Sequence, residues 1–222
     1  MSSRYGRGDV GAFDRFAPLY DPLMPSAGVQ ELHEGFAFAN RPVRRVLDLA
    51  GGTGRVADAL RREAESRNPD PDGDDNAPGS AVAEPIVVDI SAPMLARAHE
   101  RGLATVRADA STLPFRDGGE ETDAAIDAIV IVDAYHHLPD QPAALAEAAR
   151  VLAPGGVVVI RDFDPETLVG RAIETGEALF GMGSQFVDVD GAAAALSRAG
   201  LHSRVVERGS TYTVVGRRPR EN

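Results

Sequence analysis

Val46-Leu47-Asp48-Leu49-Ala50-Gly51-Gly52-Thr53-Gly54-Arg55-Val56-Ala57 is the stretch that decides the fold. It opens on a short apolar run, Val46–Ala50, that is typical of a buried strand, and a helical pattern continues from Gly54 to about Glu65. Glycines at such a junction let backbone amides approach a ligand closely, and the first turn of the helix offers unpaired N–H groups to an anion. The segment therefore predicts a strand–loop–helix unit that binds a ligand.

The rest of the chain continues this alternation of strands and helices. Further apolar runs predict strands at Ile86–Ile90, Thr105–Arg107, Ala125–Asp133 and Val157–Phe163. Helical patterns fall at Ala92–Arg101, Gln141–Leu152, Thr167–Phe180 and Gly191–Ala199. The last two strands, His202–Glu207 and Thr211–Gly216, are joined so closely that they predict an antiparallel hairpin at the sheet edge. This order predicts an α/β fold with a doubly wound, mostly parallel seven-stranded sheet and helices on both faces.

The sequence divides into a small cap and one larger domain. Residues 1–42 predict an N-terminal helical cap, with an aromatic segment at Phe13–Tyr20 and a helix that Ser26 can cap, running to about Ala39. Residues 43–222 predict one Rossmann-like domain. Within it, Arg67–Glu84 is rich in proline and aspartate and poor in apolar residues. We therefore expect an acidic loop insertion over about residues 66–84 that carries no chemistry.

The composition of the 222 residues excludes several kinds of protein. With no cysteine, the chain has no disulfides, thiolate zinc sites or cysteine nucleophiles. A net charge of −11 disfavours a nucleic-acid partner, because an acidic surface repels phosphate. The chain has arginine but no lysine, which fits either a salt-adapted protein or a GC-rich coding bias, and both stay open. No apolar run is long enough to span a bilayer and no secretory signal is evident, so we expect a cytoplasmic protein.

The glycine segment by itself leaves two ligands open. Gly52-x-Gly54-x-x-Ala57 matches the fingerprint G-x-G-x-x-G/A of dinucleotide-binding proteins, which favours an NAD-dependent oxidoreductase. Asp48 argues against that ligand, because a carboxylate just below the loop would add negative charge beside a pyrophosphate. A ligand that carries both an ammonium and a carboxylate, as an amino acid does, suits the same place better.

Later segments also fall where strands are expected to end. Val87-Val88-Asp89-Ile90-Ser91 closes the second strand, and Asp109-Ala110 follows the third. Asp133-Ala134-Tyr135-His136-His137-Leu138-Pro139-Asp140 follows the fourth strand, and Leu152-Ala153-Pro154-Gly155-Gly156 turns into the fifth. An adenosine needs hydrogen-bond acceptors for its two ribose hydroxyls, another for its amino group, and apolar side chains on both faces of the adenine ring. The residues that supply these in turn are Asp89, Asp109 and the pair Ile90 and Met94.

In this order, the segments resemble the motifs of class I S-adenosylmethionine-dependent methyltransferases, over about residues 43–218. The resemblance implies that S-adenosylmethionine is the co-substrate, that Asp89 holds its ribose hydroxyls, and that Asp109-Ala110 reads its adenine. We expect Asp48, Asp89 and Asp109 to converge around one hollow at the edge of the sheet. The residues implied to bind S-adenosylmethionine are Asp48, Ala50, Gly51, Gly52, Thr53, Gly54, Asp89, Ile90, Met94, Asp109, Ala110, Asp133 and Ala134.

The segment at 133–140 and the N-terminal run Phe13–Asp21 resemble the ubiquinone/menaquinone-biosynthesis methyltransferases in particular. This resemblance implies a small-molecule acceptor, such as an isoprenoid quinone, whose ring carbon attacks after a neighbouring hydroxyl loses its proton. His136 and His137 are then the candidate bases, and Tyr20 helps to close the site. The two histidines lack spacing partners for a metal, so no metal site is expected.

The acceptor itself is less well defined. An apolar pocket for it is expected near Asp162, Phe163, Phe180 and Met182. A lipid-tailed acceptor implies peripheral membrane contact, although no basic amphipathic helix signals it.

Three alternatives stay open at this point. The chain can methylate another small metabolite, act as an NAD-dependent oxidoreductase, or bind S-adenosylmethionine without catalysis. A nucleic-acid methyltransferase is disfavoured, because no Asn/Asp-Pro-Pro-aromatic tetrad follows the fourth strand. The sequence does not determine the methylated atom or the oligomeric state.

Overall fold

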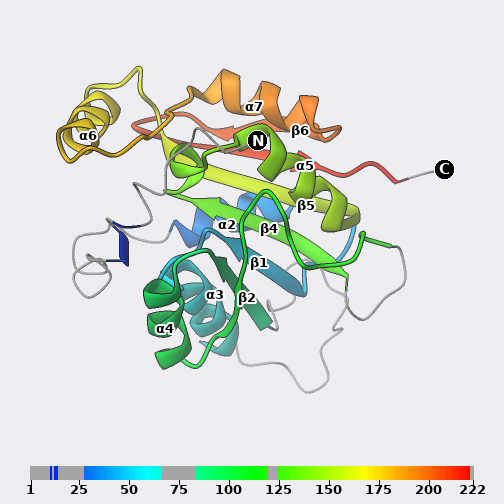
Figure 1. Ribbon diagram of the computed structural model, residues 1–222. Helices are drawn as coiled ribbons and strands as arrows, with labels where there is room; N and C mark the ends of the chain where they lie inside the picture. The colour runs from blue at the N-terminus through cyan, green and yellow to red at the C-terminus, as the bar shows by residue number, and fades with distance from the viewer. Residues whose placement is uncertain (1–10, 12, 15–27, 67–83, 120–124, 221–222) are drawn as a thin grey trace.

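The computed structural model describes residues 11, 13–14, 28–66, 84–119 and 125–220 (Figure 1). Its strands are β1 Arg45–Leu49, β2 Glu84–Asp89, β3 Ala104–Arg107, β4 Ile126–Val132, β5 Leu152–Phe163, β6 His202–Glu207 and β7 Thr211–Arg217. Its helices are α2 Val29–Phe36, α3 Arg55–Ser66, α4 Ala92–Glu100, α5 Gln141–Val151, α6 Leu168–Leu179 and α7 Val189–Arg198, with a 3₁₀ turn η3 at Tyr135–His137. Tyr20, Ser26 and residues 67–83 of the expected acidic insertion lie outside the described residues.

All seven strands form one sheet in the order β3-β2-β1-β4-β5-β7-β6. The pairs from β3 to β5 are parallel, and β7 runs antiparallel to both of its neighbours. The predicted doubly wound sheet and its terminal hairpin are thereby confirmed. From β1 the sheet grows in one direction, through β2 to β3. The chain then returns to form β4 on the other side of β1 and continues to β5. The strand order therefore reverses between β1 and β4, and ligands bind at such a reversal.

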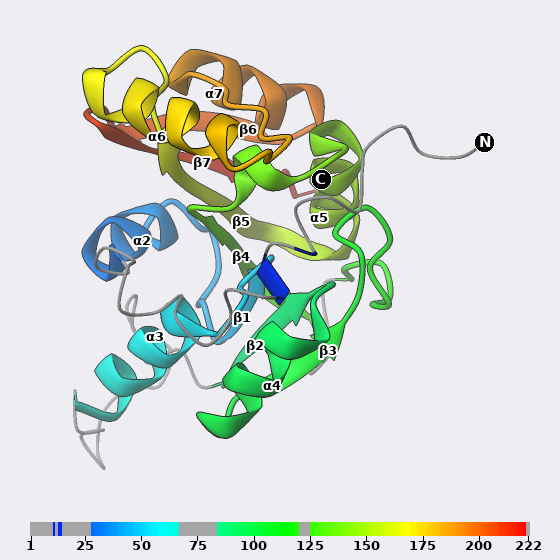
Figure 2. The same cartoon turned by 60° about the vertical axis from the view of Figure 1, so that its left-hand side comes forward.

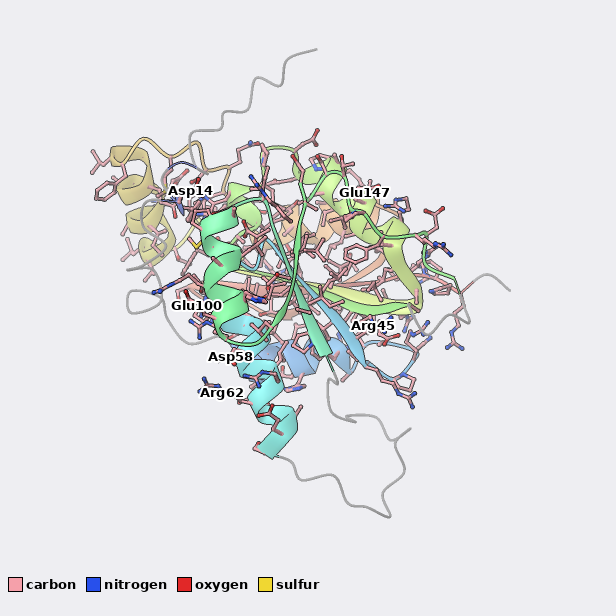
Figure 3. All side chains as sticks on the ribbon, turned by 60° about the horizontal axis from the view of Figure 1, so that its bottom comes forward. Asp14, Arg45, Asp58, Arg62, Glu100 and Glu147 are labelled. Carbon is pink, nitrogen blue, oxygen red and sulfur yellow. The ribbon has the colours of Figure 1, made fainter. Side chains whose placement is uncertain are left out.

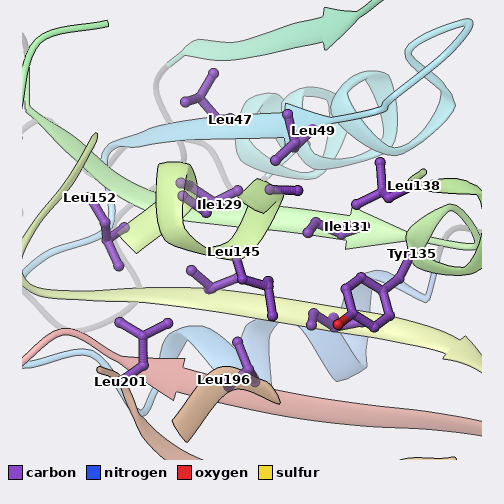
Figure 4. Close-up of a cluster of buried hydrophobic side chains, with 14 of the residues drawn as sticks. Leu47, Leu49, Ile129, Ile131, Tyr135, Leu138, Leu145, Leu152, Leu196 and Leu201 are labelled. Atoms are coloured by element: carbon purple, nitrogen blue, oxygen red, sulfur yellow. The ribbon is translucent and has the colours of Figure 1, made fainter. Parts of the chain in front are cut away.

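One face of the sheet packs against α5 and α7. Leu47, Leu49, Ile129 and Ile131 point to this side from the central strands, and all four are buried (Figure 4). They meet Leu145 of α5 in the same cluster. The central strands are therefore held by apolar side chains from segments far apart in the sequence. Truncating one such side chain to alanine typically lowers the free energy of unfolding by about 2–5 kcal/mol.

The other face packs against α2, α3 and α4 (Figure 2). Val46 and Val130 meet Leu32 of α2 and Leu60 of α3 in one buried cluster. A smaller cluster joins α3 to α4 through Val87. Each central strand is thus covered on both sides, which explains the continuous apolar run Ala128–Val132 in β4.

Two boundaries differ from the predictions. β5 begins at Leu152 instead of Val157, and its pairing with β4 shifts register between Ile126 and Ala128. At the start of α2, Gly28 occupies the N-cap position with a left-handed φ of 63°, where Ser26 was expected. A Cβ at Gly28 would lie 2.5 Å from the Arg161 Nε, so a larger residue here would displace this arginine as well as strain the backbone. Among the described helices, none has the length and apolar content needed to cross a membrane.

Gly54 and Gly102 allow a matched test of packing at the start of α3. Both have left-handed φ angles, +74° and +78°, so alanine strains the backbone at each. A Cβ at Gly54 would lie 2.5 Å from Leu103 Cδ1 and 3.0 Å from Ala98 Cβ, whereas at Gly102 it meets no described atom within 4 Å. We expect Gly54→Ala to lower the free energy of unfolding by about 1–3 kcal/mol more than Gly102→Ala, because only the first overpacks the core. Urea denaturation measures both; equal losses would mean that crowding is unimportant here.

Candidate active site

The glycine loop between β1 and α3 turns sharply at the carboxyl edge of the sheet. Ala50, Gly52 and Gly54 all have positive φ angles of 57°, 55° and 74°. Gly54 N–H donates to the Gly51 carbonyl at 2.9 Å, and Gly51 N–H donates to Val88 of the neighbouring β2 at 3.2 Å. A non-glycine residue at φ 57° is strained, and such strain is typical of ligand-binding turns.

Asp89 joins the end of β2 to this loop. Its Oδ2 accepts a hydrogen bond from Gly52 N–H at 2.8 Å, and its Oδ1 accepts one from Ser91 N–H at 2.8 Å. A Cβ at Gly52 would lie 3.9 Å from Met94 Sδ, so the glycine, the carboxylate and the methionine are close together. Burial raises the pKa of Asp89 in spite of these amides. Ile90 lies next to them with 43% of its surface exposed.

The N-terminal segment also reaches this place. Ser91 caps α4 by accepting a hydrogen bond from Met94 N–H, and its hydroxyl donates to Asp14 Oδ1 at 2.6 Å. Figure 3 shows Asp14 at one end of α4 and Glu100 toward the other. Asp14 is therefore held beside the loop through Ser91.

Asp48 lies beneath the loop and is buried. Its Oδ2 accepts a hydrogen bond from Ala57 N–H at 3.2 Å, and a Cβ at Gly51 would approach its carboxyl carbon to 2.5 Å. Burial is the main reason why the pKa of Asp48 is raised to about 7. Asp48 therefore supports the loop from below, and Thr53 beside it in the loop is fully buried.

Asp109 has a different environment. It is exposed, and its Oδ1 accepts hydrogen bonds from the backbone and the hydroxyl of Ser111, at 2.8 and 2.7 Å. Its backbone is tied to the end of β2, because Ala108 N–H donates to the Asp89 carbonyl at 3.0 Å. Ala110 packs against the core. The loop thus brings Asp48 and Asp89 together, whereas the Asp109 carboxylate is engaged by its own turn.

Asp133, which follows β4, is buried between two guanidinium groups. Arg55 of the glycine loop donates to its Oδ2 at 3.0 Å, and Arg161 of β5 lies 3.3 Å from its Oδ1. Asp133 has a φ of 51°, and burial raises its pKa although both arginines oppose the change. Ala134 follows as the buried N-cap of η3. The Asp133 carboxylate is thus already paired, and its backbone N–H donates to the Arg161 carbonyl at 2.9 Å.

His136 is almost completely buried beside Asp162. Its Nδ1 lies 2.6 Å from Asp162 Oδ1, and its backbone N–H donates to Asp162 Oδ2 at 3.0 Å. The ring stacks on Phe186 with centroids 4.3 Å apart. Burial favours the neutral ring, but the carboxylates of Asp162 and Glu177 raise the pKa of His136 to about 9. Without a ligand, His136 is therefore protonated at neutral pH, which disfavours a role as general base.

His137 lies against Glu177 of α6. Its Nε2 is 3.7 Å from Glu177 Oε1, and Ser184 Oγ lies 3.3 Å from its Nδ1. The Phe13 ring meets the His137 ring edge-on at 4.8 Å. Burial opposes the charge of Glu177, but the two histidines lower the pKa of that carboxyl.

Several of these residues were missed by sequence reasoning. Glu177 and Ser184 come from a segment with no motif, and Arg161 sits inside an apolar strand. The one available signal was the charge of Arg161 within that strand, because buried charges are almost always paired. Of the expected acceptor-pocket residues, Asp162 is bound to His136, and Phe180 is 77% exposed.

The raised pKa of Asp48 leads to a pH-dependent stability. The folded protein keeps this proton to about pH 7, whereas the unfolded chain releases it near the ordinary value of 3.8. Stability therefore falls as the pH rises from about 4 to 7, by on the order of 4 kcal/mol at 1.36 kcal/mol per pKa unit. Asp48→Asn cannot ionise, so we expect a flatter stability profile across this range and a more stable protein at pH 8.

Urea denaturation at pH 5 and pH 8 measures the difference. Glu100→Gln, which removes an exposed carboxylate from α4, is the control and should keep the wild-type profile. If the stability of wild type and of Asp48→Asn changed equally between the two pH values, the raised pKa of Asp48 would be contradicted.

Comparison with known proteins shows the same fold at close to full length. A methyltransferase of Thermotoga maritima, described as S-adenosylmethionine-dependent, superposes with a TM-score of 0.68 at 20% identity, covering 96% of this chain and 99% of that one. The structure of DhpI in complex with S-adenosylhomocysteine superposes with a TM-score of 0.67 at 19% identity and covers both chains fully.

Sequence relatives are more similar but match over a shorter length. The chain is 39% identical over 165 residues to a demethylmenaquinone methyltransferase of Thermus thermophilus, covering 69% of this chain and 64% of the relative. It is 32% identical over 165 residues to the ubiquinone/menaquinone biosynthesis C-methyltransferase UbiE of Cupriavidus metallidurans, covering 69% and 59%. The model of the methyltransferase domain family matches residues 24–204, which include the glycine loop, Asp89 and the histidine pair. The chain therefore belongs to the methyltransferase domain family.

Proposed function

We propose that this chain transfers a methyl group from S-adenosylmethionine to a small apolar acceptor, of which an isoprenoid quinone is the best-supported class. The observation that carries the proposal is the contact of Asp89 with the Gly52 amide beside Met94. It brings an acceptor for ribose hydroxyls, a close-approach glycine and a soft apolar side chain to the point where the strand order reverses.

The loop suits a zwitterionic ligand better than a dinucleotide. The N-terminus of α3 favours a carboxylate, while the Asp89 carboxylate beside the loop would repel a pyrophosphate. Asp109 and Ile90 remain the proposed contacts of adenine, and Ala50 to Gly54 the proposed contacts of the methionine part. The binding experiment below distinguishes this proposal from an NAD-dependent oxidoreductase, which would bind NADH instead of S-adenosylhomocysteine.

The reaction requires little chemistry from the protein. The acceptor atom attacks the methyl carbon in line with the sulfur, the sulfur–carbon bond breaks, and S-adenosylhomocysteine leaves with the electron pair. For a carbon acceptor the ring also loses a proton, which must be taken up nearby. Alignment is worth about 7–11 kcal/mol in such reactions. We propose that the acceptor is held beside His136 and His137, which follow β4, and Glu177 of α6.

The surface of α6 supports an apolar acceptor. Leu168, Leu179 and Phe180 are 86%, 83% and 77% exposed on or next to this helix, which also supplies Glu177. Figure 1 shows α6 at the end of the molecule, away from the sheet. Two relatives are named for demethylmenaquinone or ubiquinone/menaquinone biosynthesis. We propose that α6 contacts the lipid tail and touches a membrane surface; a cytoplasmic location and a closing role for Tyr20 remain predictions.

Binding of S-adenosylhomocysteine tests the proposed site. Asp89→Asn removes the charge that would hold the ribose hydroxyls, and a hydrogen bond to a charged group is worth about 1.5–3 kcal/mol. We therefore expect calorimetry to show about 10–100-fold weaker binding of S-adenosylhomocysteine, and an unchanged melting temperature would show that the fold is intact. Asp190→Asn, at an exposed ion pair with Arg208, is the control and should bind as the wild type does. Tight binding of NADH with none of S-adenosylhomocysteine would overturn the proposal.

The acceptor class is tested separately at α6. Replacing Leu168, Leu179 and Phe180 together by serine should raise the KM for a long-tailed demethylmenaquinone several-fold, because apolar contacts with the tail are lost. The KM for a tailless analogue and the affinity for S-adenosylhomocysteine should not change. Labelled-methyl transfer measures both acceptors, and equal changes for the two would argue against a tail contact.

A further inference from the structure

We infer that His136, His137 and Glu177 form a binding site for one divalent transition-metal ion of the zinc type. These three residues each offer one ligand atom, and the three atoms lie within 4.8 Å of one another. The inference concerns metal binding and holds whether or not the proposed methyl transfer is correct.

The distances between the ligand atoms fit a common metal ion. His136 Nε2 lies 3.3 Å from Glu177 Oε1, and His137 Nε2 lies 3.7 Å from the same oxygen. Ligands bound to zinc at about 2.0–2.1 Å in a tetrahedron are separated by about 3.3 Å. Both histidine–glutamate separations are therefore within a few tenths of an ångström of this value, and the two histidine nitrogens lie within 4.8 Å of each other.

The His136 Nε2 atom points to a missing ligand. The ring is 2% exposed, and among the described residues nothing hydrogen-bonds to this nitrogen, even though Glu177 Oε1 is near. A buried polar atom without a partner is costly, on the order of 1–3 kcal/mol. A cation between the nitrogen and the carboxylate would remove that cost.

The surrounding hydrogen bonds turn the correct atoms toward the centre. Asp162 accepts a hydrogen bond from His136 Nδ1, so when a cation displaces the other ring proton, the lone pair of that ring is on Nε2. Ser184 donates its single hydroxyl proton to Glu177 Oε2 at 2.5 Å, so it accepts at His137 Nδ1, 3.3 Å away. With the His136 Nε2 proton displaced, two nitrogen lone pairs and a carboxylate oxygen are directed at one centre. Metal-bound histidines in proteins are held by such outer carboxylates and hydroxyls.

The type of ligand selects the metal. Two imidazoles and one carboxylate suit zinc and its neighbours in the first transition row, whereas magnesium and calcium prefer oxygen ligands throughout. Three protein ligands leave one position of a tetrahedron open, which is the arrangement of exchangeable zinc sites. His137 and Glu177 are only half-buried, with side chains 14% and 17% exposed, so a water or a small molecule can reach this position.

Metal titration of the untagged full-length protein tests the inference. After chelation and dialysis, the protein is titrated with Zn²⁺ against a chromophoric chelator, and separately with Co²⁺ while visible absorption is recorded. We expect one equivalent of Zn²⁺ and Co²⁺ bands of a four- or five-coordinate site. Glu177→Gln and His137→Ala should each weaken Zn²⁺ binding more than about 100-fold, and Asp162→Asn by about 10–100-fold.

A matched control uses the histidine–glutamate contact on the other face of the sheet. His33 Nδ1 lies 3.5 Å from Glu63, so His33→Ala removes a similar pair that has no second histidine, and Zn²⁺ binding should not change. If His137→Ala does not fold, Glu177→Gln still decides the question, because it keeps the shape of the side chain. Absence of stoichiometric binding to the wild type, or equal binding to Glu177→Gln, would overturn the inference.

Discussion

The buried carboxylate of Asp133 between Arg55 and Arg161 is the interaction on which the candidate site depends. It joins three elements at the reversal of strand order: the glycine loop through Arg55, the end of β4 through Asp133, and β5 through Arg161. Gly28 at the start of α2 packs on the same arginine. Removing one partner of such a buried pair typically costs 3–5 kcal/mol, because the remaining charge is left without compensation.

Several features that reduce stability lie close together at the carboxyl ends of the central strands. Asp48, Asp89 and Asp133 are all held in places where burial raises the pKa of the carboxyl. Ala50 and Asp133 adopt left-handed backbone angles at the ends of the two central strands. The buried apolar faces on both sides of the sheet offset these costs, and a rigid sheet can hold strained, charged groups that a loop alone could not.

The fold could be predicted closely because its signals are local and repeat. Each central strand appeared as a short apolar run and each helix as an amphipathic pattern, and the rules of parallel sheets allow few arrangements of that order. Predictions were less accurate where tertiary contacts override local signals. Gly28 rather than Ser26 is the N-cap of α2, with Arg161 packed beside it, and β5 extends back to Leu152 because Ile126 of β4 pairs with it.

The sequence by itself determined the succession of strands and helices, the glycine loop and the positions of Asp48, Asp89 and the histidine pair at strand ends, since each follows from residue type and spacing along the chain. Only the tertiary structure decided what those side chains meet. It buried Asp48 beneath the loop, engaged Asp109 with Ser111, and paired Asp133 with two arginines. It also brought Glu177 from α6 to His136 and His137. Such partners come from segments far apart in the sequence, so burial, pairing and ligand geometry arise only when the sheet and its helices pack.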